Sequence, residues 1–150
     1  MSSLSTTIRG VARRQRRDSS AMWSGERVDG VGLFDATTSP QAARTIGEVV
    51  STPLLAGLTA PLTGFENHRG GTVLGAAASP LGAVKKGAGN RAGDGFDGAV
   101  QGTVIATYMH GPCLARNPEL ADLLLSNVVG KLTPLELPEV ESLRRERLRA

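Results

Sequence analysis

The amino-acid sequence predicts an α/β domain, in which strands end in loops and a helix follows them along the chain. Residues 45–51 are rich in β-branched side chains and predict a strand. Asn117, Pro118 and Glu119 predict a helix start, because Asn caps helices, Pro fits the first helical position and Glu favours the positive end of the dipole. A length of 150 residues leaves room for one domain with a modest core.

The N-terminal part of the chain differs from the rest in composition and in its apolar pattern. Residues 1–27 are rich in Ser, Thr and Arg and show no sustained apolar period, so we expect a basic, disordered arm. The folded domain is expected to span residues 28–150. Residues 37–40 predict a turn, and Pro53 and Pro61 bracket a loop. Residues 62–74 contain three glycines, a histidine and an arginine, which favours backbone shaped for close approach over a regular element.

The C-terminal part contains a glycine-rich loop at residues 87–98 and an apolar segment at residues 99–110. Apolar residues on both faces of that segment predict a buried strand, with His110 at its C-terminal end before a Gly-Pro turn. In the helix that starts at Asn117, we expect Gly130 to end the helix and four apolar residues to form its buried stripe: Leu120, Leu123, Leu124 and Val128. Residues 139–149 predict a short charged helix that docks through Val140, Leu143 and Leu148.

Composition and charge exclude several classes of protein. The net charge of +3 comes from arginines at the two ends of the chain, and aromatic residues make up only 3%, so a nucleic-acid partner is not expected. No apolar run approaches the roughly 20 residues that a membrane helix needs. A single cysteine, Cys113, rules out an internal disulfide and fits a cytoplasmic location. We expect no metal and no cofactor, because His68 and His110 lack a third ligand at a recognisable spacing, and because the G-x-G-x-x-G run at residues 93–98 opens a strand instead of a helix.

Two residues are candidates for chemistry. His110 is placed where α/β proteins gather their sites, at the C-terminal end of a predicted strand, although an isolated histidine is more often structural. Arg44 opens a predicted strand, where an exposed arginine usually only interacts with solvent. Spacing alone leaves both alternatives open.

A series of short motifs resembles one family. In order, these are Gly30-Val-Gly-Leu-Phe-Asp-Ala-Thr-Thr38, Arg44-Thr-Ile-Gly-Glu-Val-Val50, Leu62-Thr-Gly-Phe-Glu-Asn-His68, Gly87-Ala-Gly-Asn90, Thr107-Tyr-Met-His-Gly-Pro112 and Asn117-Pro-Glu-Leu-Ala-Asp122. Together they resemble the CobB/CobQ-like class I glutamine amidotransferases, and within them the GatD group of glutaminase subunits. The resemblance covers roughly residues 28–131 and implies the C-terminal part of a flavodoxin-like domain whose N-terminal half is missing.

The resemblance also implies roles for residues and partners. In this family a cysteine attacks the side-chain amide of glutamine and a histidine serves as general base and acid. His110 matches that histidine, and Arg44 matches the arginine that holds the carboxylate of the substrate. Cys113 follows His110 too closely on one loop to be the nucleophile, so we expect the chain to be inactive alone. The partner implied is a MurT-like Mur ligase, which receives ammonia from glutamine to amidate the glutamate of lipid II.

Two alternatives from the same motifs remain. The amidotransferase part of a cobyric acid or cobyrinate diamide synthase shares the histidine turn. A non-catalytic interaction module would keep the partner-facing surface without the nucleophile. A basic-armed nucleic-acid binder is a third, weaker alternative.

Overall fold

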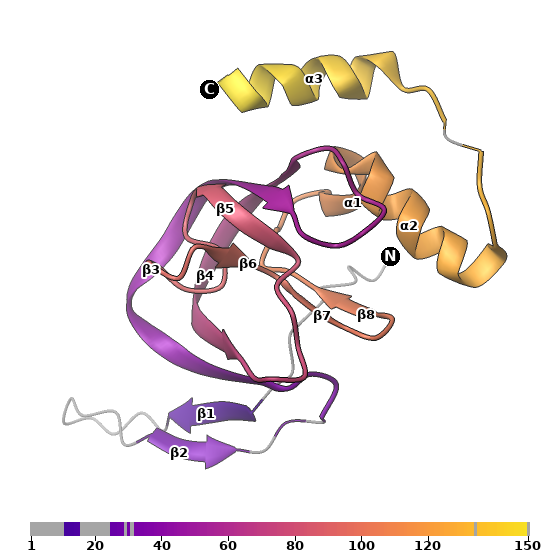
Figure 1. The fold of residues 1–150 in the computed structure, drawn as a ribbon. Coiled ribbons are helices and arrows are strands. Elements are labelled where there is room, and N and C mark those ends of the chain that lie inside the picture. Colours follow the sequence, from indigo (N-terminus) through magenta and orange to yellow (C-terminus); the bar gives the residue numbers. More distant parts are fainter. Residues whose placement is uncertain (1–10, 16–24, 29, 31, 134, 150) are drawn as a thin grey trace.

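The computed structural model describes residues 11–15, 25–28, 30, 32–133 and 135–149 of the chain. The strands form one body, α1 and α2 lie at one end of it, and α3 lies beyond them (Figure 1). The elements are β1 (Val11–Gln15), β2 (Gly25–Val28), β3 (Ala36–Pro53), β4 (Leu62–Leu74), β5 (Gly82–Lys86), β6 (Phe96–Asp97), β7 (Ala99–Gln101), β8 (Val104–Ala106), α1 (Cys113–Arg116), α2 (Pro118–Val129) and α3 (Pro138–Arg149).

The main sheet is mixed. Its strand order is β2-β1-β3-β5-β6, and β4 also pairs with β3. The β1–β3 pair is parallel, and the other pairs within the described residues are antiparallel. The predicted combination of a sheet with helices is therefore confirmed, but the helices follow the strands instead of alternating with them. β1 and the first three residues of β2 fall within residues 1–27, whose other residues lie outside the described part, so the predicted arm stays a prediction.

The long β3–β4 pair dominates the body and corrects two predictions. Residues 37–40 do not form the predicted turn, since they belong to β3 and oppose residues 70–73 of β4. Pro40 has no N–H for the ladder, and the register shifts between Pro40 and Thr45, which accommodates the proline at an irregularity of the strand.

Residues 62–74 form the regular strand β4, so the expected irregular backbone is also wrong. The glycines do permit close approach, but within the strand. A Cβ added at Gly64 would lie 2.5 Å from the side chain of Met109, and one at Gly70 would lie 2.8 Å from the Tyr108 hydroxyl. The absence of side chains thus lets the segment around Met109 pack directly onto β4.

The predicted single strand over residues 99–110 is a hairpin followed by an extended segment. β7 pairs with β8 through the register Gln101↔Val104, and the turn between them contains Gly102 at φ +61°. Only glycine adopts that conformation at no steric cost, which explains why the apolar run folds back. Residues 107–109 belong to no strand, and His110 pairs with Phe65 of β4 through an isolated bridge.

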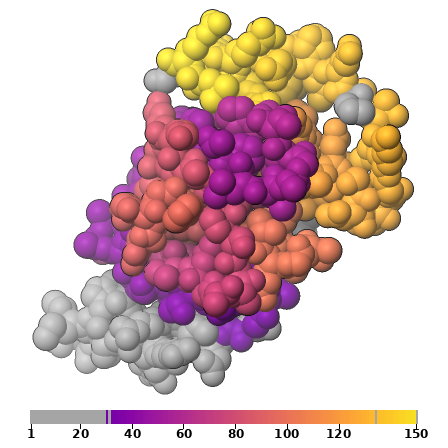
Figure 2. Space-filling model, viewed as in Figure 1, coloured from indigo at the N-terminus to yellow at the C-terminus, as the bar shows by residue number. Residues whose placement is uncertain are grey.

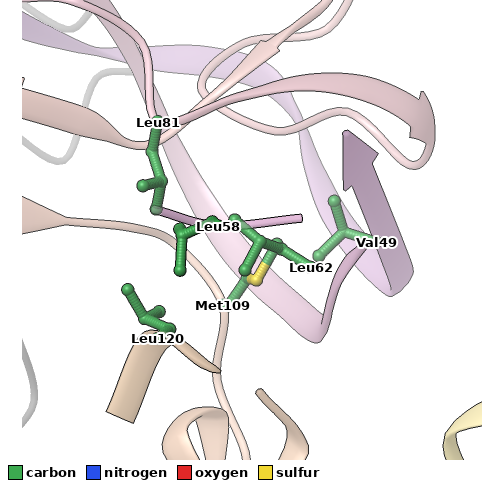
Figure 3. Close-up of a cluster of buried hydrophobic side chains, with 6 residues drawn as sticks. All are labelled: Val49, Leu58, Leu62, Leu81, Met109 and Leu120. Carbon is green, nitrogen blue, oxygen red and sulfur yellow. The ribbon is translucent and has the colours of Figure 1, made fainter. Parts of the chain in front are cut away.

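The core lies between the sheet and α2. Six buried side chains form its main cluster, which Figure 3 shows: Val49, Leu58, Leu62, Leu81, Met109 and Leu120. Met109 belongs to this cluster and is the residue directly before His110. The backbone that carries the candidate histidine is therefore anchored in the core.

The helices bear out some predictions and contradict others. α2 begins at Pro118 and ends before Gly130, which has φ +83°, as predicted. Val128 is 83% exposed and does not belong to the buried stripe, because the core ends at the first turns of α2. The Asn117 side chain does not cap α2, since its amide bonds the backbone N–H and C=O of Thr63 at 2.8 and 2.9 Å.

α3 docks only in part as predicted: of the three expected docking residues, Val140 is half-buried. Leu143 and Leu148 are exposed, whereas Arg144 is buried and donates to the Pro61 carbonyl at 2.5 Å. The helix lies as a separate ridge along one end of the body (Figure 2). α3 is a polar helix without a continuous apolar stripe. The hydrogen bond from its buried Arg144 therefore helps to hold it to the body.

Candidate functional site

The site is built around β4, whose side chains alternate between two environments. Glu66 and His68 are buried, while Phe65 and Asn67 are exposed. This alternation follows from the period of two in a strand. The chemically suggestive residues of the Gly-Phe-Glu-Asn-His segment are thus divided between an inner and an outer face.

His110 is held at β4 by its backbone. Its N–H donates to the Phe65 carbonyl at 2.7 Å, and its carbonyl accepts the Phe65 N–H at 3.3 Å. The side chain is exposed. Gly111 follows at φ +69° and turns the chain away towards α1. The exposed imidazole is accessible to a bound substrate, and a general acid or base must come within hydrogen-bond reach of the proton that it transfers.

Arg44 lies on β3, just before its register with β4 resumes at Thr45. Its Nε donates to the Asn67 Oδ1 at 2.6 Å, and the side chain is exposed. Phe65 and Asn67 are two residues apart, which is about 7 Å along a strand. Because β4 lies between β3 and the His110 segment at this point, the structure places the two predicted site residues on either side of one short stretch of β4.

An ion pair links the sheet to the helix that follows His110. Arg116 of α1 is buried and bonds both carboxylate oxygens of Glu48, which lies opposite Phe65 in the β3–β4 ladder. The ion pair holds the segment after His110 at Glu48, and the backbone of His110 is bonded to Phe65. Since Glu48 and Phe65 are opposite each other, both ends of this segment are held at the same point of the sheet. Sequence reasoning gave neither residue a role, since no local pattern links positions 48 and 116.

The inner face of β4 carries a buried polar cluster. Glu66 accepts the N–H groups of Ala88 and Gly89 at 2.7 and 2.9 Å, so its carboxylate holds the glycine-rich loop. The His68 ring stacks on Tyr108 with centroids 4.0 Å apart, and His68 Nδ1 lies 2.8 Å from the Gly70 carbonyl. These contacts give Glu66 and His68 structural roles.

Asp97 extends this cluster beneath the His110 loop. Its side chain is fully buried, and burial raises its pKa to about 6, while the hydrogen bond from Thr107 lowers the pKa and the charge of Glu66 raises it further. Thr107 donates to both carboxylate oxygens, at 3.1 and 3.3 Å. Asp97 is therefore an interior anchor at the end of the glycine-rich loop.

Cys113, the one cysteine of the chain, begins α1. Its side chain packs against the main core cluster, and burial raises the pKa of its thiol. The Asn117 amide lies 3.8 Å from its Sγ. A thiol with a raised pKa is mostly protonated at neutral pH, which is the opposite of what a nucleophile needs.

The described residues form neither a metal cluster nor a membrane-spanning helix. There, no group of three or more His, Cys, Asp or Glu side chains is placed to hold a metal ion. No helix in that part of the chain is long and apolar enough to span a membrane.

Comparison with known proteins identifies the family of this chain. A model of the CobB/CobQ-like glutamine amidotransferase domain matches residues 12–118, beginning inside the segment predicted to be an arm. The chain is 32% identical over 119 residues to the lipid II isoglutaminyl synthase (glutamine-hydrolyzing) subunit GatD of Staphylococcus aureus, covering 79% of this chain and 47% of the relative. For the GatD subunit of Streptococcus pneumoniae the identity is 33% over 123 residues, covering 80% and 46%.

Cobyric acid synthases are similar as well. A probable cobyric acid synthase of Methanothermobacter thermautotrophicus is 40% identical over 90 residues, which cover 56% of this chain and 18% of the relative. The chain thus spans about half the length of the GatD subunits and under a fifth of this synthase. The match to the family model covers more than half of the chain, including both Arg44 and His110. The chain therefore belongs to the CobB/CobQ-like glutamine amidotransferase family.

Proposed function

We propose that this chain supplies the histidine and arginine side of a glutaminase site, as the C-terminal part of a flavodoxin-like amidotransferase domain. His110 acts as general base and acid, and Arg44 binds the α-carboxylate of glutamine. The observation that carries the proposal is that an exposed imidazole and an exposed guanidinium border the same two residues of β4, Phe65 and Asn67.

The geometry supports a division of labour between the two residues. Arg44 is anchored through Nε, which leaves its terminal nitrogens for the paired hydrogen bonds that a carboxylate accepts. His110 is fixed by its backbone at Phe65, so its Cα keeps one position relative to that carboxylate site. A thiolate is still required for acyl transfer, and we propose that Cys113 does not supply it, because its side chain packs into the core.

The pathway proposed is the amidation of lipid II, with a MurT-like Mur ligase that receives the ammonia. The GatD relatives cover about four-fifths of this chain, whereas two cobyric acid synthases cover 56% and 70% of it. The alternative is the amidotransferase part of a cobyric acid or cobyrinate diamide synthase, which the higher identity of 40% over the shorter stretch favours.

Binding of glutamine tests the site. We expect addition of L-glutamine to the ¹⁵N-labelled chain to shift amide signals around residues 44, 67 and 110. Arg44→Lys should weaken this binding by at least about tenfold, because the bidentate geometry is lost. The matched control is Arg145→Lys, on the exposed surface of α3. Equal binding by both variants, or no shifts at these residues in the wild type, would contradict the proposed role of Arg44.

Partner choice tests the pathway. The purified chain is mixed in turn with a MurT-like Mur ligase and with the synthetase part of a cobyric acid synthase, and association is followed by size-exclusion chromatography. We expect a complex with the Mur ligase alone. A complex only with the cobyric acid synthetase part would select the alternative. Binding to the Mur ligase without any binding of glutamine would select a non-catalytic interaction module.

A further inference from the structure

We infer that Thr107 and the buried Asp97 act together as positioning residues for His110. The inference rests on the proposed catalytic role of His110. It concerns how the imidazole is held in place before any substrate arrives, and neither residue is placed in contact with glutamine.

The Thr107 hydroxyl is engaged on both sides. It donates to the two carboxylate oxygens of Asp97 at 3.1 and 3.3 Å, and it accepts the N–H of Met109 at 3.1 Å. Residues 107–109 belong to no strand, so a ladder does not fix their backbone. The next N–H, that of His110, donates to the Phe65 carbonyl at 2.7 Å. Two consecutive N–H groups are therefore anchored immediately before the imidazole.

The position of Asp97 is fixed by its backbone and by burial. Its backbone pairs with Gly82 of β5, and its carbonyl accepts the N–H of Leu81 at 3.0 Å. Its side chain is fully buried. Residues 107–109, which belong to no strand, are thus linked through the Thr107 hydroxyl to a residue that the sheet holds in place.

Above the Asp97 pKa of about 6, the ionised carboxylate also decides which way the hydroxyl points, so the measurements are made at pH 7 or higher. A carboxylate only accepts hydrogen bonds, so the proton of the Thr107 hydroxyl must face Asp97 and a lone pair is left for the Met109 N–H. A neutral, donating group at position 97 would let the hydroxyl turn and would release Met109. The charge of Asp97, and not only its size, is therefore part of the arrangement.

Packing makes the position of Met109 sensitive to this bond. Its side chain sits over Gly64 of β4, where even an added Cβ would lie 2.5 Å away. Close packing on a glycine leaves little tolerance for a shift of the backbone. A change at Thr107 should then reach His110, one residue further on.

The test measures the order of the His110 segment in the complete chain, without glutamine. Thr107→Val keeps the shape and removes the hydroxyl, and Thr107→Ser keeps the hydroxyl. The matched control is Thr59→Val, which removes another hydroxyl–carboxylate bond, the 2.6 Å bond to Glu119, in which neither Asp97 nor residues 107–110 take part. Amide hydrogen exchange at Met109 and His110 and the line shape of the His110 ring signals are recorded by NMR.

We expect Thr107→Val to lower the protection of both amides by at least about tenfold and to broaden the ring signals. Thr107→Ser should restore both to within about threefold of the wild type, and Thr59→Val should leave both unchanged. A folded Thr107→Val chain with unchanged protection and an unchanged His110 ring would overturn the inference, because a merely structural role lowers stability without a selective effect at His110.

Asp97→Asn provides a second route if Thr107→Val does not fold. Its amide can donate to the hydroxyl, so protection at Met109 and His110 should fall while the amide of Leu124, in the interior of α2, stays protected. Unchanged protection at both amides would overturn the inference. Since none of these measurements uses glutamine, failure to bind glutamine would count against the proposed function alone.

Discussion

The two faces of β4 carry similar residue types but differ in burial and in the contacts that their side chains make. On the inner face, Glu66 and His68 are buried, and their contacts are to the glycine-rich loop and to Tyr108. At the outer face, His110 and Arg44 are exposed and border Phe65 and Asn67. One strand thus separates a cluster that stabilises the fold from the residues available to a substrate.

The difference shows that a titratable side chain is a weak indication of catalysis by itself. His68 Nε2 lies 3.7 Å from Glu66 Oε2 and makes no hydrogen bond to any described residue, yet the ring is enclosed. His110 combines an anchored backbone with an exposed ring. Accessibility on an ordered backbone is what separates the two histidines.

The largest expected effect is the absence of turnover. The proposed site on the outer face contains His110 and Arg44 but no cysteine, so we expect the chain alone to release no ammonia from glutamine. Loss of the nucleophile in a hydrolase lowers the rate by on the order of a millionfold. The measurement is a coupled glutamate-release assay on the purified chain, run beside His110→Ala and Cys113→Ala. Turnover that either substitution abolishes would show that Cys113 or an unrecognised group is the nucleophile.

The next effect concerns stability and the inner face. Glu66→Ala leaves the buried N–H groups of Ala88 and Gly89 without their acceptor, which should lower the free energy of unfolding by about 3 kcal/mol. Asn67→Ala, one residue further on the outer face, is the matched control and should change it by less than about 0.5 kcal/mol. Denaturant unfolding measures both. Similar losses for the two variants would erase the distinction between the faces.

Asp97 allows the inner cluster to be probed by pH. Its pKa of about 6 in the folded chain exceeds the ordinary value of 3.8, so between these values the folded chain keeps a proton that the unfolded chain has released. Its contribution to stability is therefore present below about pH 4 and is lost as the pH rises through 6. This contribution amounts to at most about 3 kcal/mol.

Asp97→Asn should remove that dependence. The difference in unfolding free energy between the wild type and this variant should change steadily from pH 4 to pH 7, with the wild type losing stability relative to the variant. Denaturant unfolding at intervals of pH gives the two curves. Parallel curves would mean that the Asp97 carboxyl titrates normally and that the inner face does not desolvate it.

Local rules explain what the sequence could predict of the fold. The start of α2 at Pro118, its end before Gly130 and the strand over residues 45–51 depend on neighbouring residues alone. The strand over residues 62–74 was missed because its glycines suit a strand only when Met109 and Tyr108 pack onto them. The fold-back at Gly102 was missed although Gln101-Gly102-Thr103 interrupts the apolar run, because an isolated glycine in a strand pattern also fits a bulge.

The candidate site likewise contains residues that the sequence could indicate and residues that it could not. Arg44 and His110 were found through resemblance, and their placement beside one strand could come only from the pairing of β4. Glu66 and His68 are two positions apart, a spacing that places both on one face of a strand, and this signal was present in the sequence. Asp97 and Thr107 gave no such signal, because ten residues and a hairpin separate them.

The smallest expected effect is on the stability of the outer face. His110→Ala and Arg44→Ala should each change the free energy of unfolding by less than about 0.5 kcal/mol, because both side chains are exposed and the contacts that hold His110 come from its backbone. The Arg44 bond to Asn67 joins two exposed groups and contributes little against solvent. Thermal and denaturant unfolding of both variants, beside Glu66→Ala, provide the measurement. A loss above about 2 kcal/mol at His110 would mean that its ring is a structural element of the fold, and its proposed role as a freely available base would then be wrong.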